Sequence, residues 1–131
     1  MGLLMSQDSP LSEMTAITRD ILCRTPLIFH RRPGLQQRIA TWAETSPEQM
    51  QIAATYNVVS GDPVNFVRSG LGYFLTTRDM LPDVLSADVC FRPLAPALET
   101  HYALVWKQSA VLSRAAQAFL EEVKGQLANK E

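Results

Sequence analysis

The stretch Leu27-Ile28-Phe29-His30-Arg31-Arg32-Pro33-Gly34-Leu35 contains the change of pattern that decides the fold. Its first four residues form a short apolar run, which is typical of a strand, and the next four form a turn. A helical pattern follows at once, because apolar side chains recur on one face of a 3.6-residue period, at Leu35, Ile39, Trp42 and Ala43. The stretch thus predicts a strand, a tight turn and a helix in direct succession.

The same succession repeats further along the chain. Residues 51–56 predict a second strand, residues 63–70 a helix capped by Ser60 or Asp62, and residues 71–76 a third strand. Strands and helices that alternate with short connections form right-handed crossovers. We therefore expect an α/β fold with a mostly parallel sheet that is flanked by helices.

Four more elements follow this core. The pattern predicts a short helix over residues 78–81 and two strands over residues 89–94 and 102–107. Residues 113–127 predict an amphipathic helix with Ser113 as its N-cap. Its apolar face consists of Ala116, Phe119, Leu120, Val123 and Leu127. That face needs a surface to pack against.

The composition is that of a single globular domain, with 131 residues, 47% hydrophobic and 19% charged. A formal charge of -1 without a basic stripe disfavours nucleic-acid binding by this chain. No apolar run approaches the roughly 20 residues that span a bilayer, and the N-terminus lacks the positive region of a secretory signal. Cys23 and Cys90 are isolated in apolar surroundings, which is typical of reduced, structural thiols. These features favour a cytoplasmic protein without a membrane segment.

The sequence shows no clear motif for catalysis, a metal or a cofactor. Gly70-Leu71-Gly72 resembles half of a dinucleotide fingerprint, but it closes a helix and opens a strand, the reverse of what that motif requires. His30 and His101 have no carboxylate or thiolate at ligand spacing. Ser60 and Ser113 lack the context of a nucleophile elbow. We therefore expect no enzymatic activity, no metal site and no cofactor.

Position indicates a binding site more clearly, because ligands of open parallel sheets bind beyond the carboxyl ends of the strands. Here that edge comprises His30-Arg31, Asn57 to Ser60, and Thr76-Thr77. The middle loop leads into a predicted helix N-terminus, which favours an anion, and Arg31 can add a charge-assisted hydrogen bond. In the alternative interpretation, Asn57 and Ser60 only satisfy loop and cap groups, and Arg31 is a solvated surface cation.

Five segments in register resemble the effector-binding domain of LysR-type transcriptional regulators. The segments are Gly2 to Met5 with Asp8 to Leu11, Pro26 to Ile28, Ala54 to Asn57, Val67 to Tyr73, and Leu112 to Leu120. No single segment is very specific, but their order and spacing extend over almost the whole chain. The resemblance implies a type 2 periplasmic-binding-protein-like fold, in which two α/β subdomains hold a small-molecule effector in the cleft between them.

The resemblance also divides the chain. Residues 1–25 correspond to the end of the first effector subdomain and the crossover, residues 26–107 to the second subdomain, and residues 108–131 to a C-terminal helix that returns toward the first. The family's winged helix-turn-helix has no counterpart in this sequence. We therefore expect a fragment of a longer regulator, which contacts DNA only through a helix-turn-helix domain absent from this chain.

Carried over residue by residue, the resemblance implies ligand contacts at His30, Arg31, Asn57, Val58, Val59, Ser60 and Thr76. We expect a small-molecule effector, anionic by the argument above, and binding by half a cleft that is weak or undetectable by calorimetry. The apolar face of residues 113–127 and a strand at residues 2–5 without its usual partner predict a homo-oligomer. The alternative function is a solute-receptor fragment or stand-alone binding module without a transcriptional role.

Overall fold

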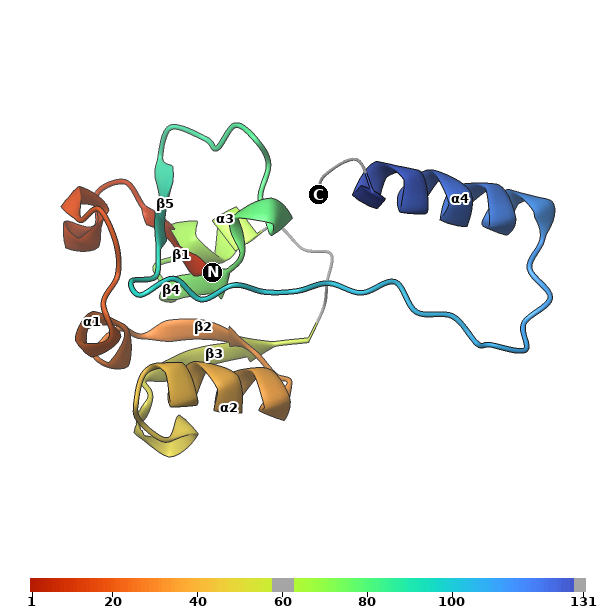
Figure 1. The fold of residues 1–131 in the computed structure, drawn as a ribbon. Coiled ribbons are helices and arrows are strands. Elements are labelled where there is room, and N and C mark those ends of the chain that lie inside the picture. The colour runs from red at the N-terminus through yellow and green to blue at the C-terminus, as the bar shows by residue number, and fades with distance from the viewer. Residues whose placement is uncertain (58–62, 129–131) are drawn as a thin grey trace. The chain divides into compact units, whose positions relative to one another are not determined.

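A computed structural model describes residues 1–57 and 63–128 of the chain (Figure 1). It has two compact units, Met1–Thr100 and His101–Glu131, which we call the first and second unit. The strands are β1 (Gly2–Ser6), β2 (Leu27–His30), β3 (Ile52–Tyr56), β4 (Tyr73–Thr76) and β5 (Val89–Pro93). The helices are α1 (Arg19–Cys23), α2 (Pro33–Trp42), α3 (Pro63–Arg68) and α4 (Arg114–Ala128), with short 3-10 helices at Pro10–Glu13, Pro47–Gln49 and Arg78–Met80.

The five strands form one mixed sheet in the order β3-β2-β4-β1-β5. Strand β2 pairs in parallel with both β3 and β4, as the alternation of strands and helices predicts. Strand β1 runs antiparallel to β4 on one side and to β5 on the other. Four strands therefore share one direction and only β1 opposes them, so the prediction of a mostly parallel sheet flanked by helices is confirmed.

Strand β1 corrects one expectation. We expected the strand at residues 2–5 to lack a partner, but Leu4 pairs with Phe74 on one side and with Phe91 on the other. Gly2 permits this central position, since a Cβ there would lie 2.3 Å from the Arg92 carbonyl oxygen. Residues 2–6 thus belong to the same sheet as residues 27–93. The assignment of residues 1–25, 26–107 and 108–131 to parts of a two-subdomain protein remains a prediction.

Two hydrophobic clusters cover the two faces of the sheet. On the face covered by α1 and α2, the buried side chains include Leu3, Met5, Leu27, Phe29, Leu75, Ile39 and Leu22. On the face covered by α3, they include Leu4, Ile28, Phe74, Val64 and Val67. Helix α3 packs across β1 and β4, and α2 lies along β2 (Figure 1). Adjacent strand residues alternate between the clusters because successive side chains point to opposite faces.

The pairing of β3 with β2 contains a register shift near the predicted binding edge. Leu27 pairs with Ile52, but Ile28 pairs with Ala54, so the register moves by one residue between them. As a result, Ile52 packs against the cluster on the α2 face, whereas Ala54 and Tyr56 pack against the cluster on the α3 face. An unbroken alternation would place all three side chains on one face.

The second unit contains α4 and the segment that precedes it. The predicted helix at residues 113–127 is confirmed, and the Ser113 hydroxyl accepts a hydrogen bond of 3.2 Å from the backbone N–H of Ala116. The predicted strand at residues 102–107 is wrong, because that segment has no regular structure. A strand requires a neighbour, and the described residues of this unit supply none.

Candidate functional site

Three residues lie at one edge of the sheet, each at the carboxyl end of one of three adjacent parallel strands. His30 ends β2, Tyr56 ends β3 and Thr76 ends β4. His30 pairs directly with Tyr56, and Thr76 lies two residues beyond Phe74, the partner of Ile28. By strand alternation all three belong to the α3 face. We call this group the strand-end row.

His30 is held by its own neighbours. Its Nδ1 accepts a hydrogen bond of 3.1 Å from the backbone N–H of Arg32, and its carbonyl oxygen accepts one of 3.2 Å from the side chain of Gln36. Burial lowers the pKa of His30 from its ordinary value, and the positive charge of Arg32 lowers it further. The imidazole is therefore neutral near pH 7, with its proton on Nε2 because Nδ1 is the acceptor.

The ring of Tyr56 connects His30 to a cluster of aromatic rings. His30 contacts Tyr56 edge to face, with centroids 5.0 Å apart. Tyr56 stacks on Phe74 at 4.7 Å, and Phe74 stacks on Phe66 of α3 at 6.2 Å. Phe74 is buried, whereas Phe66 is 37% exposed, so the cluster extends from the core to the surface. We call these four residues the aromatic cluster.

The structure places the predicted site residues in different settings. It brings His30 and Thr76 to one edge, with Thr76 buried. Arg31 and Asn57 are exposed, each one residue beyond its strand, and the Arg31 backbone N–H donates a 2.7 Å hydrogen bond to the Tyr56 carbonyl oxygen. Val58, Val59 and Ser60 lie outside the described residues, as does the predicted capping residue Asp62.

The sequence pattern did not indicate Tyr56 as a residue of this edge. The predicted site followed the strand at residues 51–56 and began only at Asn57. A signal was present, because Tyr56 ends that strand as His30 ends the preceding one. The alternation of side chains did not reveal its face, since the register shift at Ala53 changes it.

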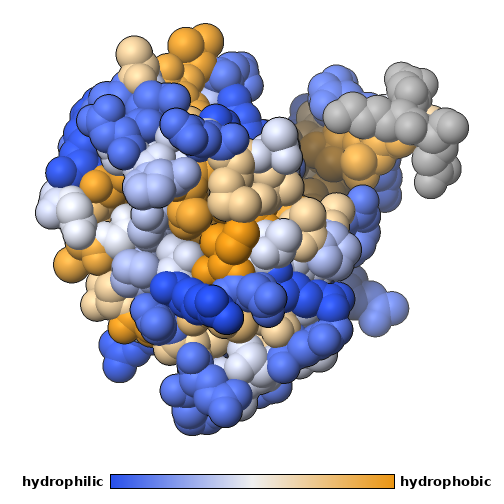
Figure 2. Space-filling model, turned by 90° about the vertical axis from the view of Figure 1, so that its left-hand side faces the viewer, coloured by the Kyte–Doolittle hydropathy of each residue, from blue (hydrophilic) through white to orange (hydrophobic). Residues whose placement is uncertain are grey.

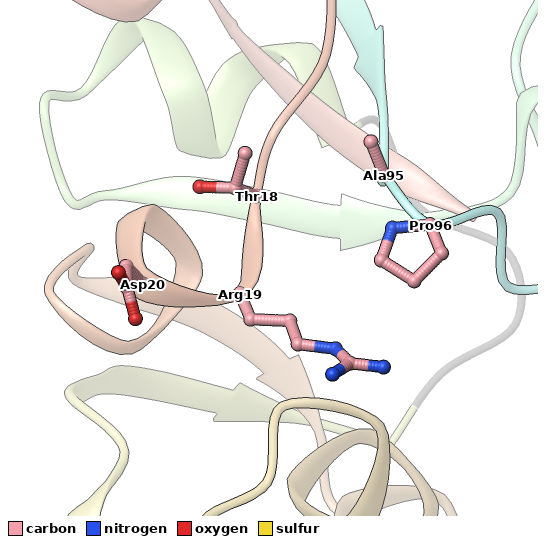
Figure 3. A pocket seen from close by; sticks show the side chains of 5 residues that line it. All are labelled: Thr18, Arg19, Asp20, Ala95 and Pro96. Atoms are coloured by element: carbon pink, nitrogen blue, oxygen red, sulfur yellow. The ribbon is translucent and has the colours of Figure 1, made fainter.

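A separate hollow of about 330 Å³ lies between the start of α1 and the segment after β5. Thr18, Arg19, Asp20, Ala95 and Pro96 line it (Figure 3). The side chain of Arg19 extends toward Pro96, while Thr18 and Asp20 point away from it (Figure 3). The Arg19 guanidinium forms an ion pair with Glu44 and lies 5.9 Å from the centre of the Trp42 ring. Because Arg19 already has structural partners, we do not assign a ligand to this hollow.

Other site types find little support in the part of the chain that the structure describes. Residues 1–57 and 63–128 contain no group of three His, Cys, Asp or Glu side chains that could hold a metal ion. Burial raises the pKa of the Cys90 thiol, which keeps it protonated and unreactive. Across the same ranges no helix has the length and apolarity to cross a membrane. On the side of the first unit where α1 lies, hydrophobic and hydrophilic residues are interspersed (Figure 2).

Comparison with known proteins identifies the family. The family model described as "LysR substrate binding domain" matches residues 1–128. The chain belongs to the LysR substrate-binding domain family. The five landmark segments of the sequence therefore predicted the family correctly. No curated protein matched the chain.

Solved LysR-family structures share the fold. The C-terminal domain of a probable LysR family transcriptional regulator from Rhodococcus sp. RHA1 superposes with a TM-score of 0.64 at 22% identity, covering 94% of this chain and 62% of that one. HinK, a LysR family transcriptional regulator from Pseudomonas aeruginosa, gives 0.68 at 23% identity, covering 96% and 44%. A putative LysR family transcriptional regulator from the same species, PA01 protein, gives 0.62 at 21%, covering 96% and 44%.

This chain therefore spans less than two thirds of each of these three structures. The identities are low, so these structures support the fold and not the ligand. They confirm the α/β, periplasmic-binding-protein-like fold that the resemblance implied.

Proposed function

We propose that this LysR substrate-binding domain senses a small metabolite for a transcriptional regulator. The effector binds at the carboxyl edge of the sheet, and contacts His30, Arg31, Asn57, Val58, Val59, Ser60 and Thr76. The strand-end row carries the proposal, because it places polar tips at the ends of three adjacent parallel strands. Open α/β sheets bind ligands at such edges.

The charges at this edge favour an anionic effector. Arg31 is exposed beside His30, and the charge of Arg32 acts on the His30 ring. A carboxylate placed here would gain charge-assisted hydrogen bonds from a guanidinium. The neutral imidazole adds an N–H donor without requiring a particular pH near 7.

Regulation requires that the effector prefer one arrangement of the longer protein. We propose that it binds in a cleft between this subdomain and a second one, and that it shifts the arrangement of the homo-oligomer. DNA is contacted only through a helix-turn-helix domain outside this chain. Coupling of this kind amounts to about 1–3 kcal/mol. A ligand of micromolar to millimolar affinity gains about 4–8 kcal/mol, which suffices if its affinities for the two arrangements differ.

The test is to map ligand contacts by NMR on the 131-residue chain. A panel of small carboxylates, amino acids and sugars is titrated to about 10 mM, and the backbone amide shifts are followed. We expect at least one compound to shift the amides of His30, Arg31 and Thr76 with millimolar affinity. The amide of Val84, which is 86% exposed in another part of the first unit, serves as the reference.

Two outcomes would contradict the proposal. In one, no compound shifts the strand-end amides. In the other, all shifts cluster around Arg19 and Ala95, which would move the site to the hollow beside α1. Binding tighter than micromolar by this chain alone would instead contradict the requirement for a second subdomain.

A further inference from the structure

The aromatic cluster packs on the α3 face of the sheet, and it also extends to the proposed binding edge. Strand β2 lies between β3 and β4, yet Tyr56 of β3 stacks on Phe74 of β4. The Tyr56 ring therefore reaches across the end of β2. The ring lies next to His30, the last residue of β2 and a member of the strand-end row.

The exposure of the rings is graded along the cluster. Phe74 is only 6% exposed and belongs to the core, whereas Phe66 at one end is 37% exposed. His30 and Tyr56 at the other end are half-buried. Flat carbon surface is thus accessible next to polar groups. Aromatic side chains favour ring-bearing partners, because offset-stacked and edge-to-face pairs gain attraction beyond the area they bury.

Polar groups beside this ring surface select a hydrogen-bond acceptor with negative charge. Because Nδ1 of His30 accepts from Arg32, the imidazole has its single donor at Nε2. Within residues 1–57 and 63–128, no residue accepts a hydrogen bond from that atom. Arg32 is the charged neighbour that acts on His30, and Arg31 follows His30 directly. Both charges are positive.

We infer that this edge recognises a carboxylate attached to an aromatic ring, with Tyr56 as the residue that determines the preference for the ring. The carboxylate accepts from His30 and the neighbouring guanidinium groups. The ring packs on Tyr56 and on the exposed part of the aromatic cluster. This inference rests on the proposed function, since it names the ligand class for the same edge.

The experiment compares benzoate with cyclohexanecarboxylate, which has the same charge and a similar size but no aromatic ring. Both are titrated into the 131-residue chain, and the His30 and Thr76 amide shifts report binding. We expect benzoate to bind about 2- to 10-fold more tightly, the range that an aromatic pair supplies. We also expect ring-current shifts and intermolecular NOEs between benzoate protons and the Tyr56 or Phe66 ring.

Tyr56→Leu tests the assigned residue. It should remove the preference for benzoate while both carboxylates still bind, because the charged neighbours remain. Tyr102→Leu is the matched control, since Tyr102 is 64% exposed and lies in the second unit. If Tyr56→Leu fails to fold, the NOEs in the unsubstituted chain still decide whether the ring contacts Tyr56.

The outcomes separate this inference from the proposed function. Equal affinities for the two carboxylates, or benzoate contacts that avoid Tyr56 and Phe66, would overturn the inference. Shifts at the strand-end row with a non-aromatic panel compound but not with benzoate would overturn the inference and leave the proposed function standing. A panel that produces no shift there would overturn both.

Discussion

The ring of Tyr56 stacks on that of Phe74 with centroids 4.7 Å apart and an interplanar angle of 25°, although strand β2 separates their two strands. The edge strand β3 is therefore fastened to the centre of the sheet by a side chain as well as by backbone pairing. The contact joins the candidate binding edge to the core on the α3 face. We therefore expect the effects of substitutions at the two rings on the free energy of unfolding to be coupled.

A double-mutant cycle should detect this coupling. Tyr56→Leu and Phe74→Leu each destabilise the chain, and together they should cost about 0.5–1.5 kcal/mol less than their sum, the value of an aromatic pair. Urea denaturation measures each free energy of unfolding. The control cycle pairs Tyr56 with Phe29, which packs on the opposite face of the sheet. Coupling in the first cycle no larger than in the control would show that the stacking contributes nothing specific.

Gly72 should not tolerate alanine. Its φ of +153° is unusual for residues with a side chain, and an added Cβ would lie 2.5 Å from the Pro26 carbonyl oxygen. That oxygen also accepts a 2.9 Å hydrogen bond from the Tyr73 N–H, which begins β4. We expect Gly72→Ala to lower the free energy of unfolding by about 1–3 kcal/mol.

Gly34→Ala is the matched control for Gly72→Ala. Gly34 lies in α2 and an added Cβ there meets nothing within 4 Å. We expect a neutral effect or a gain of up to about 1 kcal/mol, because alanine favours the helix. The same urea titrations report both variants. Equal effects of the two substitutions would contradict the packing argument at Gly72.

The stability of the chain should depend on His30 below neutral pH. Burial and the charge of Arg32 lower the pKa of His30 in the folded state, while the unfolded value is about 6.5. The unfolded state therefore binds more protons between the two values. Stability rises with pH across this window and is lost as the pH falls below about 6.5.

His30→Asn should flatten this dependence, since asparagine does not titrate. The measurement is the free energy of unfolding at several values between pH 5 and pH 7.5, compared with the unsubstituted chain. His101→Asn, at an exposed residue of the second unit, keeps His30 and should retain the original slope. Parallel slopes for His30→Asn and the unsubstituted chain would refute the assignment.

The second unit should cause self-association. Its exposed apolar side chains are Tyr102, Leu104, Val105, Trp106, Val111, Phe119 and Leu127. Exposed patches of this kind recruit partners. We expect a mass by light scattering that rises with concentration at tens of micromolar, and a smaller rise for Trp106→Ser combined with Phe119→Ser. Val84→Ser, at an exposed apolar residue of the first unit, is the control. A monomeric mass for the unsubstituted chain would contradict this prediction.

Sequence patterns located the elements that are marked by signals within their own residues. The strand at Leu27–His30 was predicted with its bounds, and the helix Arg114–Ala128 to within one residue, because apolar spacing and a serine cap are local signals. The run from residue 102 to residue 107 has a strand-like composition but forms no strand. Composition alone does not supply the neighbouring strand that pairing requires.

By itself the sequence determined the family and the α/β class, since periodicity and the order of the elements are properties of the chain alone. It also indicated the strand ends from which the proposed binding edge follows. The tertiary structure decided that β1 lies between β4 and β5, and that Tyr56 shares a face with His30. Both depend on pairing between residues distant in sequence. A shift of one residue in such a pairing moves a side chain to the other face of the sheet.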